Sequence, residues 1–141
     1  MENTKLMKYL VDTNIWLEIL LDQEKSEVCS TFLKNTSSNL LAISDFSLHS
    51  ILLILTKFKK FEQATLFLED LVNSEIDVLY VDYTDMEEIL KIIKEHNLDF
   101  DDAYQYFLTK KYNLTLVSFD KDFDKTDIYR KTPEDIIKKE E

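Results

Sequence analysis

The chain has 141 residues, 45% of them hydrophobic and 32% charged, which is typical of a single soluble globular domain. It contains no glycine and one cysteine, Cys29, so glycine-rich phosphate-binding loops, internal disulfides and cysteine zinc clusters are excluded. The net charge of −11 argues against indiscriminate binding to nucleic acid, and leaves two explanations open: solubility, or acidic groups that gather around a cation.

The first element is an apolar stretch at residues 6–12 that ends in Asp12, followed directly by an amphipathic pattern over about residues 13–21. A buried strand of a parallel sheet has this uninterrupted apolar character. Such a strand delivers the carboxylate of Asp12 to the carboxyl edge of the sheet. Ligands bind at that edge in open α/β sheets, so Asp12 is the first candidate functional residue.

The rest of the chain alternates helical patterns with short apolar strands. Further strands are expected at residues 40–44, 78–81 and 114–118, with a short edge strand at 128–131. Helices are expected at about residues 25–34, 45–57, 61–73, 85–96 and 101–111, and again from Pro133. This alternation predicts one domain over residues 1–141, with its core at about 6–136 and a parallel sheet covered on both faces.

The ends of these helices also carry signals. Thr84 and Glu87 have the spacing of a capping box, and Asp99 can cap the helix that follows it. Since the chain has no glycine, asparagine, aspartate and serine are expected at helix ends and turns where glycine would normally lie.

Three further acidic side chains are expected to return to the edge that holds Asp12. Asp120 and Asp122 come just after the last long strand, and Asp102 opens the helix that leads into it. In right-handed strand–helix–strand units, every loop after a strand opens at the same edge of the sheet. A ten-residue helix descends about 15 Å and a five-residue strand climbs back about 16 Å, so Asp102 and Asp120 should lie at the same level.

Four carboxylates in one place would repel one another unless some kept their protons or a cation bound them. Oxygen ligands without histidine or cysteine favour hard ions such as Mg²⁺ or Mn²⁺, and such an ion suits the hydrolysis of phosphodiester bonds. Acidic residues are also common as helix caps and in solvated turns. Spacing alone therefore leaves both interpretations open.

Taken together, these segments resemble the PIN-domain nuclease family, which includes the VapC-like toxins of toxin–antitoxin pairs. The matching segments are residues 11–14, 101–103, 116–123 and 132–135, in order along nearly the whole chain. The resemblance implies an α/β fold, a three-layer α/β/α sandwich with a central parallel sheet of four to five strands. It also implies cleavage of RNA that depends on Mg²⁺ or Mn²⁺.

Carried over by position, the resemblance makes Asp12, Asp102 and Asp120 catalytic metal ligands, and Asp122 an accessory catalytic carboxylate. These are the same four acids that the predicted topology is expected to bring to one edge of the sheet.

Four polar residues beside these acids are candidate substrate contacts. Under the resemblance, Thr13, Asn14 and Ser118 orient water or a ligand. Lys121 lies between two of the acids in sequence, where it could contact a scissile phosphate.

One position departs from the family pattern. The family usually places a glutamate early in the helix after the second strand, where this chain has Ser50. Serine is neutral and short, which lowers the expected metal affinity and weakens the case for a second metal ion. Asp45 is a nearby substitute for the missing acid, although it does not occupy the matching position.

Three functions remain in competition. The first is a Mg²⁺- or Mn²⁺-dependent endoribonuclease, as in the toxin of a toxin–antitoxin pair, with an antitoxin protein or a second copy of the chain as partner besides RNA. The second is a degenerate PIN domain that binds RNA or protein without cutting, which Ser50 favours. The third is a phosphohydrolase of the haloacid dehalogenase type, which needs a second aspartate where this chain has Asn14.

The sequence gives no sign of a membrane segment. Its longest apolar run, residues 51–55, is far shorter than the roughly 20 residues needed to span a bilayer. No charged-then-apolar leader opens the sequence. We therefore expect a cytoplasmic protein.

Overall fold

The computed structural model describes residues 8–140 and contains one sheet of parallel strands in the order β3–β2–β1–β4. The strands are β1 (Tyr9–Val11), β2 (Leu41–Ser44), β3 (Asp77–Leu79) and β4 (Thr115–Val117). Leu10 of β1 lies opposite Ala42 on one side and Leu116 on the other. Because β1 is flanked on both sides, its carboxyl end opens in the middle of the edge of the sheet.

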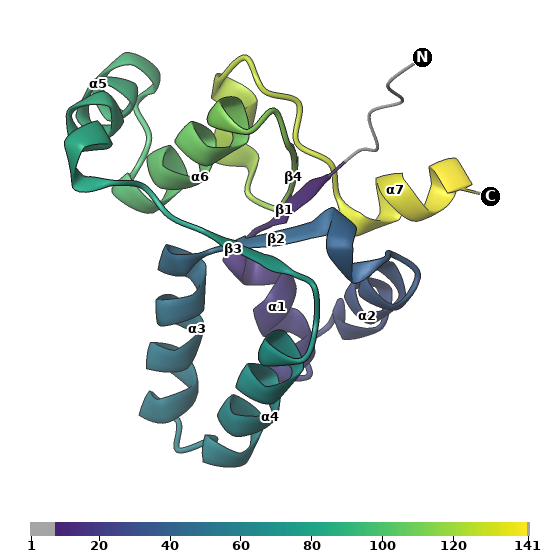
Figure 1. The fold of residues 1–141 in the computed structure, drawn as a ribbon. Coiled ribbons are helices and arrows are strands. Elements are labelled where there is room, and N and C mark those ends of the chain that lie inside the picture. Colours follow the sequence, from purple (N-terminus) through teal and green to yellow (C-terminus); the bar gives the residue numbers. More distant parts are fainter. Residues whose placement is uncertain (1–7, 141) are drawn as a thin grey trace, which may run out of the picture.

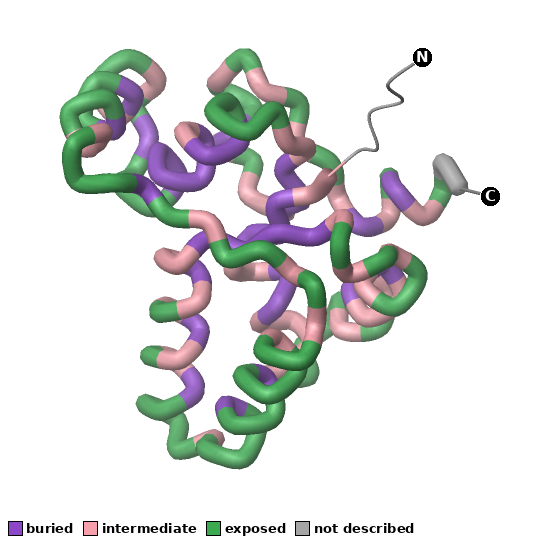
Figure 2. The backbone as a smooth tube through the Cα atoms, viewed as in Figure 1, coloured by how far each residue is buried: buried purple, intermediate pink, exposed green. Residues whose placement is uncertain are grey.

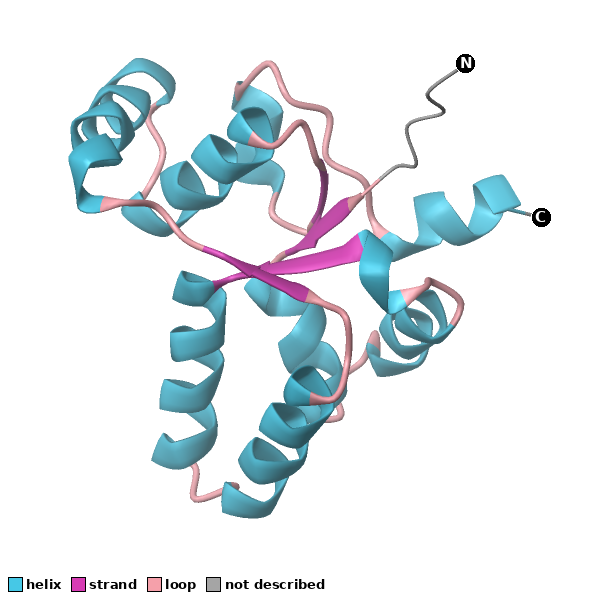
Figure 3. Cartoon of the chain, viewed as in Figure 1, coloured by secondary structure: helices cyan, strands magenta, loops and turns pink. Residues whose placement is uncertain are grey.

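Helices cover both faces of this sheet, which gives the predicted three-layer α/β/α sandwich (Figure 1). They are α1 (Thr13–Leu20), α2 (Ser26–Lys34), α3 (Asp45–Lys57), α4 (Phe61–Val72), α5 (Met86–His96), α6 (Phe100–Lys111) and α7 (Pro133–Glu140), with 3-10 turns η1 (Ser38–Leu40), η2 (Tyr83–Asp85) and η3 (Lys121–Lys125). Figure 3 shows α5 and α6 on one side of the strands, and α1, α3 and α4 on the other. Among the described residues, no helix has the length and apolar character that crossing a bilayer requires.

Strands β1, β2 and β4 are among the most deeply buried parts of the chain (Figure 2), whereas the edge strand β3 is largely exposed. Their side chains alternate between two apolar clusters, as the pleat of a strand requires. Val11, Ile43 and Val117 pack in the cluster beneath α1, α2, α3, α4 and α7. Leu10 and Leu116 pack in the cluster beneath α5 and α6. Burial on both faces explains why these strands appear in the sequence as continuous apolar runs.

The observed strands are shorter than the sequence suggested. Asp12 follows β1 as the N-cap of α1, and residues 6 and 7 of the expected first strand lie outside the described residues. The expected edge strand at 128–131 is reduced to one bridge between Lys131 and Val117. There the backbone N–H of Lys131 donates to the carbonyl of Leu116, and that of Ser118 donates to the carbonyl of Lys131, both at 2.9 Å.

Turns without glycine form largely as expected. Asp22, Asn97 and Asn113 adopt positive φ angles of 51°, 55° and 53°, which confirms aspartate and asparagine in the role of glycine. Lys59, with φ of 58°, was not expected there, because lysine has no short polar side chain to bond its own backbone.

The predicted capping box is wrong. Asp82 accepts a hydrogen bond from the backbone of Thr84 and caps η2, and α5 begins only at Met86. Asp99 does lie at the N-cap position of α6, but its side chain makes no capping hydrogen bond.

Candidate metal centre

Asp12 lies where β1 ends and α1 begins. Its Oδ1 atom accepts a hydrogen bond from the backbone N–H of Thr13 at 2.9 Å, which caps the helix. Its own N–H donates to the carbonyl of Val117 at 2.9 Å, which extends the ladder of β1 and β4 by one residue. Asp12 is 7% exposed, so the fold places a carboxylate in the interior at the carboxyl edge of the sheet.

A buried polar network holds this carboxylate in place. Gln105 Nε2 from α6 donates to Asp12 Oδ1 at 2.8 Å and to Ser47 Oγ at 3.1 Å. Ser118 Oγ donates to Asp12 Oδ2 at 2.6 Å, and Thr13 Oγ1 is hydrogen-bonded to Ser47 Oγ at 2.7 Å. The side chains of Gln105 and Ser118 thus hold the carboxylate directly, and Ser47 and Thr13 extend the network behind Gln105.

Four further aspartates form what we call the acidic cluster: Asp99, Asp102, Asp120 and Asp122. Carboxylate oxygens of Asp99, Asp102 and Asp122 lie within 4.8 Å of one another. Asp102, in the first turn of α6, is 5% exposed and lies close enough to Asp120 for that carboxyl group to raise its pKa. Asp120 Oδ1 in turn accepts a hydrogen bond from the backbone N–H of Asp122 at 2.9 Å.

Ser118 connects the acidic cluster with Asp12. Its hydroxyl donates to Asp12 Oδ2 and accepts a hydrogen bond from the backbone N–H of Asp120 at 2.9 Å. The two carboxylates that it joins are close enough to interact through their charges, because the charge of Asp120 contributes to raising the pKa of Asp12. The structure thus brings Asp12, Asp102, Asp120 and Asp122 to one edge of the sheet.

Crowding and burial oppose ionisation of these acids. Burial raises the pKa of Asp102 to about 8, and the charges of Asp120, Asp101 and Asp12 add to the effect. Burial also raises the pKa of Asp12, although the hydrogen bonds that it accepts act in the opposite direction. Without a cation, Asp102 therefore keeps its proton at neutral pH.

The donor set fits a hard divalent cation, because the clustered ligand atoms are all carboxylate oxygens. The three carboxylates that lie within 4.8 Å of one another are those of Asp99, Asp102 and Asp122, whereas the expected ligands were Asp12, Asp102 and Asp120. Asp99 takes part and was missed, since an aspartate just before a helix has the appearance of a cap. Both oxygens of Asp12 already accept hydrogen bonds.

The two residues discussed in connection with the missing glutamate lie on α3. Asp45 Oδ1 accepts a hydrogen bond from the hydroxyl of Tyr104 at 2.6 Å, and the same hydroxyl oxygen accepts the backbone N–H of Val81 at 2.9 Å. Ser50 is partly buried. Asp45 therefore links α3 to α6 through Tyr104 and does not belong to the group of close carboxylates found among the described residues.

Gln105 and Ser47 were also missed from the sequence. A glutamine in a helix usually faces solvent, yet Gln105 is 3% exposed and Ser47 is fully buried. The available signal was spacing, because Gln105 follows Asp102 by three residues and so lies on the same face of α6.

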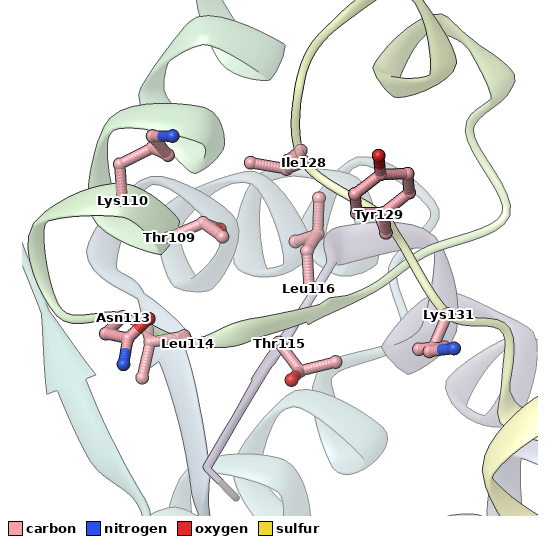
Figure 4. A pocket seen from close by; sticks show the side chains of 9 residues that line it. All are labelled: Thr109, Lys110, Asn113, Leu114, Thr115, Leu116, Ile128, Tyr129 and Lys131. Atoms are coloured by element: carbon pink, nitrogen blue, oxygen red, sulfur yellow. The ribbon is translucent and has the colours of Figure 1, made fainter.

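A separate hollow of about 420 Å³ lies at the opposite end of α6 and β4 (Figure 4). Its lining residues are Thr109, Lys110, Asn113, Leu114, Thr115, Leu116, Ile128, Tyr129 and Lys131. The lining contains no carboxylate and none of the residues of the acidic cluster.

The fold and the site together define an α/β protein with an acidic centre at the carboxyl edge of a parallel sheet. The PIN domain model matches residues 9–129, and the chain therefore belongs to the PIN domain family. No curated protein matches the sequence at a significant level.

Solved structures share this fold. VapC20 of Mycobacterium tuberculosis, a toxin that cleaves the sarcin–ricin loop, superposes with a TM-score of 0.77 at 16% identity, covering 89% of this chain and 100% of that one. FitAcB of Neisseria gonorrhoeae superposes with a TM-score of 0.70 at 20% identity, covering 89% of this chain and 98% of that one. A chain of a toxin–antitoxin complex from Klebsiella pneumoniae superposes with a TM-score of 0.67 at 20% identity, covering 82% of this chain and 90% of that one.

Proposed function

We propose that this protein is a metal-dependent endoribonuclease that hydrolyses phosphodiester bonds in RNA with Mg²⁺ or Mn²⁺ as cofactor. The observation that carries the proposal is the meeting of Asp102 with Asp99, Asp120 and Asp122 beside the buried Asp12. Membership of the PIN domain family and the fold shared with a toxin that cleaves the sarcin–ricin loop support it.

Each acid has a role that its surroundings suggest. Asp99, Asp102 and Asp122 would hold the cation, with Asp120 and Asp12 as the further ligands expected from sequence. A bound divalent cation lowers the pKa of water and stabilises charge on a phosphoryl oxygen. The three hydrogen bonds accepted by Asp12 fix its orientation, much as outer contacts orient the ligands of metal sites.

The test is replacement of Asp102 by asparagine, which keeps the shape of the side chain and removes its charge. We expect Mn²⁺-dependent cleavage of labelled RNA by the wild type, and a fall of about 100-fold or more in Asp102→Asn. Asp70→Asn, on the exposed face of α4, is the matched control. Circular dichroism checks that both variants fold, and undiminished cleavage by Asp102→Asn would refute the proposal.

A second candidate function is RNA or protein binding without cleavage. It is favoured by Ser50 in place of a glutamate, and by the hydrogen bond that holds Asp45 at Tyr104. Calorimetry separates the two candidates: an enzyme binds Mn²⁺ at the acidic cluster, whereas a non-catalytic module binds RNA and shows no heat with Mn²⁺. Family membership leaves the haloacid dehalogenase hypothesis without support.

We also propose that the enzyme acts in the cytoplasm as the toxin of a toxin–antitoxin pair, either alone or as a homodimer. The similarity in fold to a toxin–antitoxin complex and to FitAcB supports this partner class. Expression of the chain should arrest growth, and the product of an adjacent gene should relieve the arrest and co-purify with the protein. Growth arrest that persists in Asp102→Asn would contradict a toxic nuclease.

A further inference from the structure

A cavity of about 510 Å³ lies next to the acidic cluster, on the side of α1. We call it the basic pocket; its lining residues are Asn14, Glu18, Glu24, Lys25, Phe119, Lys121, Arg130 and Thr132. The pocket and the metal centre share two chain segments. Asn14 follows Asp12 by two residues, and Lys121 lies between Asp120 and Asp122. The pocket and the acidic cluster are therefore built from neighbouring residues of the same two segments.

Cationic side chains outnumber carboxylates in the lining of the pocket, whereas acids outnumber bases in the chain as a whole. Three cationic side chains face two carboxylates there, in a chain with a net charge of −11. Neighbours outside the pocket hold two of these cations. Lys25 pairs with Glu134 at 3.2 Å, and Arg130 pairs with Asp124 at 3.0 Å. These contacts fix the positions of two basic groups in the wall of the pocket.

Arg130 also ties this wall to the metal centre. Its Nη1 atom donates to the carbonyl of Ser118 at 3.2 Å, and Ser118 is the residue that hydrogen-bonds Asp12. The ammonium group of Lys25 lies 4.9 Å from the ring centroid of Phe119, within the range of a cation–π contact.

Lys121 is the cation that remains available for a ligand. It is exposed and makes no ion pair with any residue in the described part of the chain, although Asp120 and Asp122 flank it. Asp122 instead pairs with Lys125 at 3.6 Å. A lysine beside an acidic cluster that pairs with none of its acids is suited to an anionic group of the substrate.

Asn14 adds an amide to the same pocket. Its Oδ1 atom is buried and has no hydrogen-bond partner within the part of the chain that the structure describes, and an unpaired buried acceptor costs stability. With the oxygen turned inward, the amide nitrogen is the end of the side chain that can donate to a ligand in the pocket.

We propose that the basic pocket binds the phosphate of the nucleotide next to the scissile one, with Lys121 supplying the charge and Asn14 an amide donor. The proposal rests on the proposed ribonuclease function, and it adds a second anchoring point for the RNA strand. Phosphate contacts fix the register of a nucleic acid on a protein, so this pocket would decide which linkage reaches the acidic cluster.

The test measures binding alone, with the full-length Asp102→Asn protein in chelator. The probe is a fluorescent single-stranded oligouridine in which one uncharged methylphosphonate linkage is moved along the strand. We expect a severalfold loss of affinity at one linkage position. Lys121→Ala should abolish the difference between positions and reduce the slope of log affinity against log salt by about one. Lys57→Ala, an exposed lysine at the far end of α3, is the matched control and should change neither.

Asn14→Leu provides a second readout. Leucine has nearly the shape of asparagine and removes the unpartnered acceptor, so we expect an unchanged or higher melting temperature together with a weaker preference for the charged linkage. A lower melting temperature with an intact preference would show that Asn14 is structural and would overturn its part in the proposal.

The failures of the two proposals are distinguishable. If affinity depends on the position of the uncharged linkage in the same way in Lys121→Ala and Lys57→Ala, the proposal for the basic pocket is overturned, even if the protein with native Asp102 cleaves RNA. If the dependence on linkage position is lost only in Lys121→Ala but the native protein shows no Mn²⁺-dependent cleavage, the proposed ribonuclease function is overturned. The pocket then remains as an RNA-binding site.

Discussion

Under the proposed function, the protonated carboxyl group of Asp102 would couple metal binding to pH. Its pKa is raised to about 8, so a cation that binds below this pH must displace a proton. We expect the affinity for Mn²⁺ to increase as the pH rises from about 6 to about 8. Calorimetry in buffers of different ionisation enthalpy should show release of about one proton per ion. An affinity that is independent of pH would contradict the assignment of Asp102 as a ligand.

The same group affects stability in the absence of metal. The folded protein holds the Asp102 proton to a pH of about 8, whereas the unfolded chain releases it near the ordinary value of 3.8. The folded state therefore binds more protons over this range, and its stability falls as the pH rises from about 4 to about 8. An asparagine at this position cannot ionise, so Asp102→Asn should unfold at higher urea than the wild type at a pH of about 8 in chelator. The difference in urea midpoint between the variant and the wild type should become smaller towards a pH of about 5. A difference that stays constant with pH would contradict this account.

At the residue scale, carboxylates at strand ends were predictable, and their partners were not. Asp12, Asp120 and Asp122 follow buried strands, which is a signal of topology rather than of local conformation. Asp99 has the sequence signature of a cap, and only the folded structure shows that its carboxylate faces Asp102. The neutral residues that hold Asp12 left no pattern in the sequence, because burial of a glutamine depends on what packs against its helix.

At the element scale, η3 holds the acidic residues Asp120 and Asp122 through one apolar anchor. Phe123 is fully buried in the cluster beneath α5 and α6, and it lies between Asp122 and Asp124. We expect Phe123→Ala to lower the free energy of unfolding by about 3–5 kcal/mol, measured by urea denaturation, and to weaken Mn²⁺ binding in the fraction that remains folded. Phe58→Ala, at a phenylalanine that is 60% exposed, is the control and should change either quantity little.

Helices and strands were predicted well where burial dictates the pattern. The central strands and α3, α4 and α6 match their expected positions closely, because each buries a continuous face. The errors occur at polar ends. Thr84 and Glu87 have the spacing of a capping box. Instead, Asp82 accepts a hydrogen bond from the backbone N–H of Thr84 and caps η2. Residues 128–131 run beside β4 with one bridge at Lys131, since the apolar content that suggested a strand does not fix a ladder of hydrogen bonds.

At the scale of the whole molecule, a divalent cation should act as a stabilising ligand. Any ion that binds the folded state alone raises its stability, by about 2.7 kcal/mol at a concentration about 100 times the dissociation constant. We expect Mn²⁺ to raise the melting temperature and chelator to reverse the increase, with little effect of NaCl at matched ionic strength. The increase should be lost in Asp102→Asn. An equal increase in that variant would mean that the ion acts only by screening the net charge of −11.

The order of strands was the part of the architecture that no local pattern could supply. Alternating helices and strands predict a parallel sheet, but the placement of β1 between β2 and β4 depends on contacts between distant segments. The convergence of Asp12 with the acids of residues 102–122 depends on that placement.

The central position of β1 has a consequence for a chain that is still being made on the ribosome. Asp12 emerges early, but its contacts with Gln105 and Ser118 span 93 and 106 positions. A nascent polypeptide can pair β1 with β2 and pack α1, yet it lacks the aspartates that complete the centre until the last third of the chain has been translated. The centre therefore cannot assemble on the ribosome before those residues have been translated.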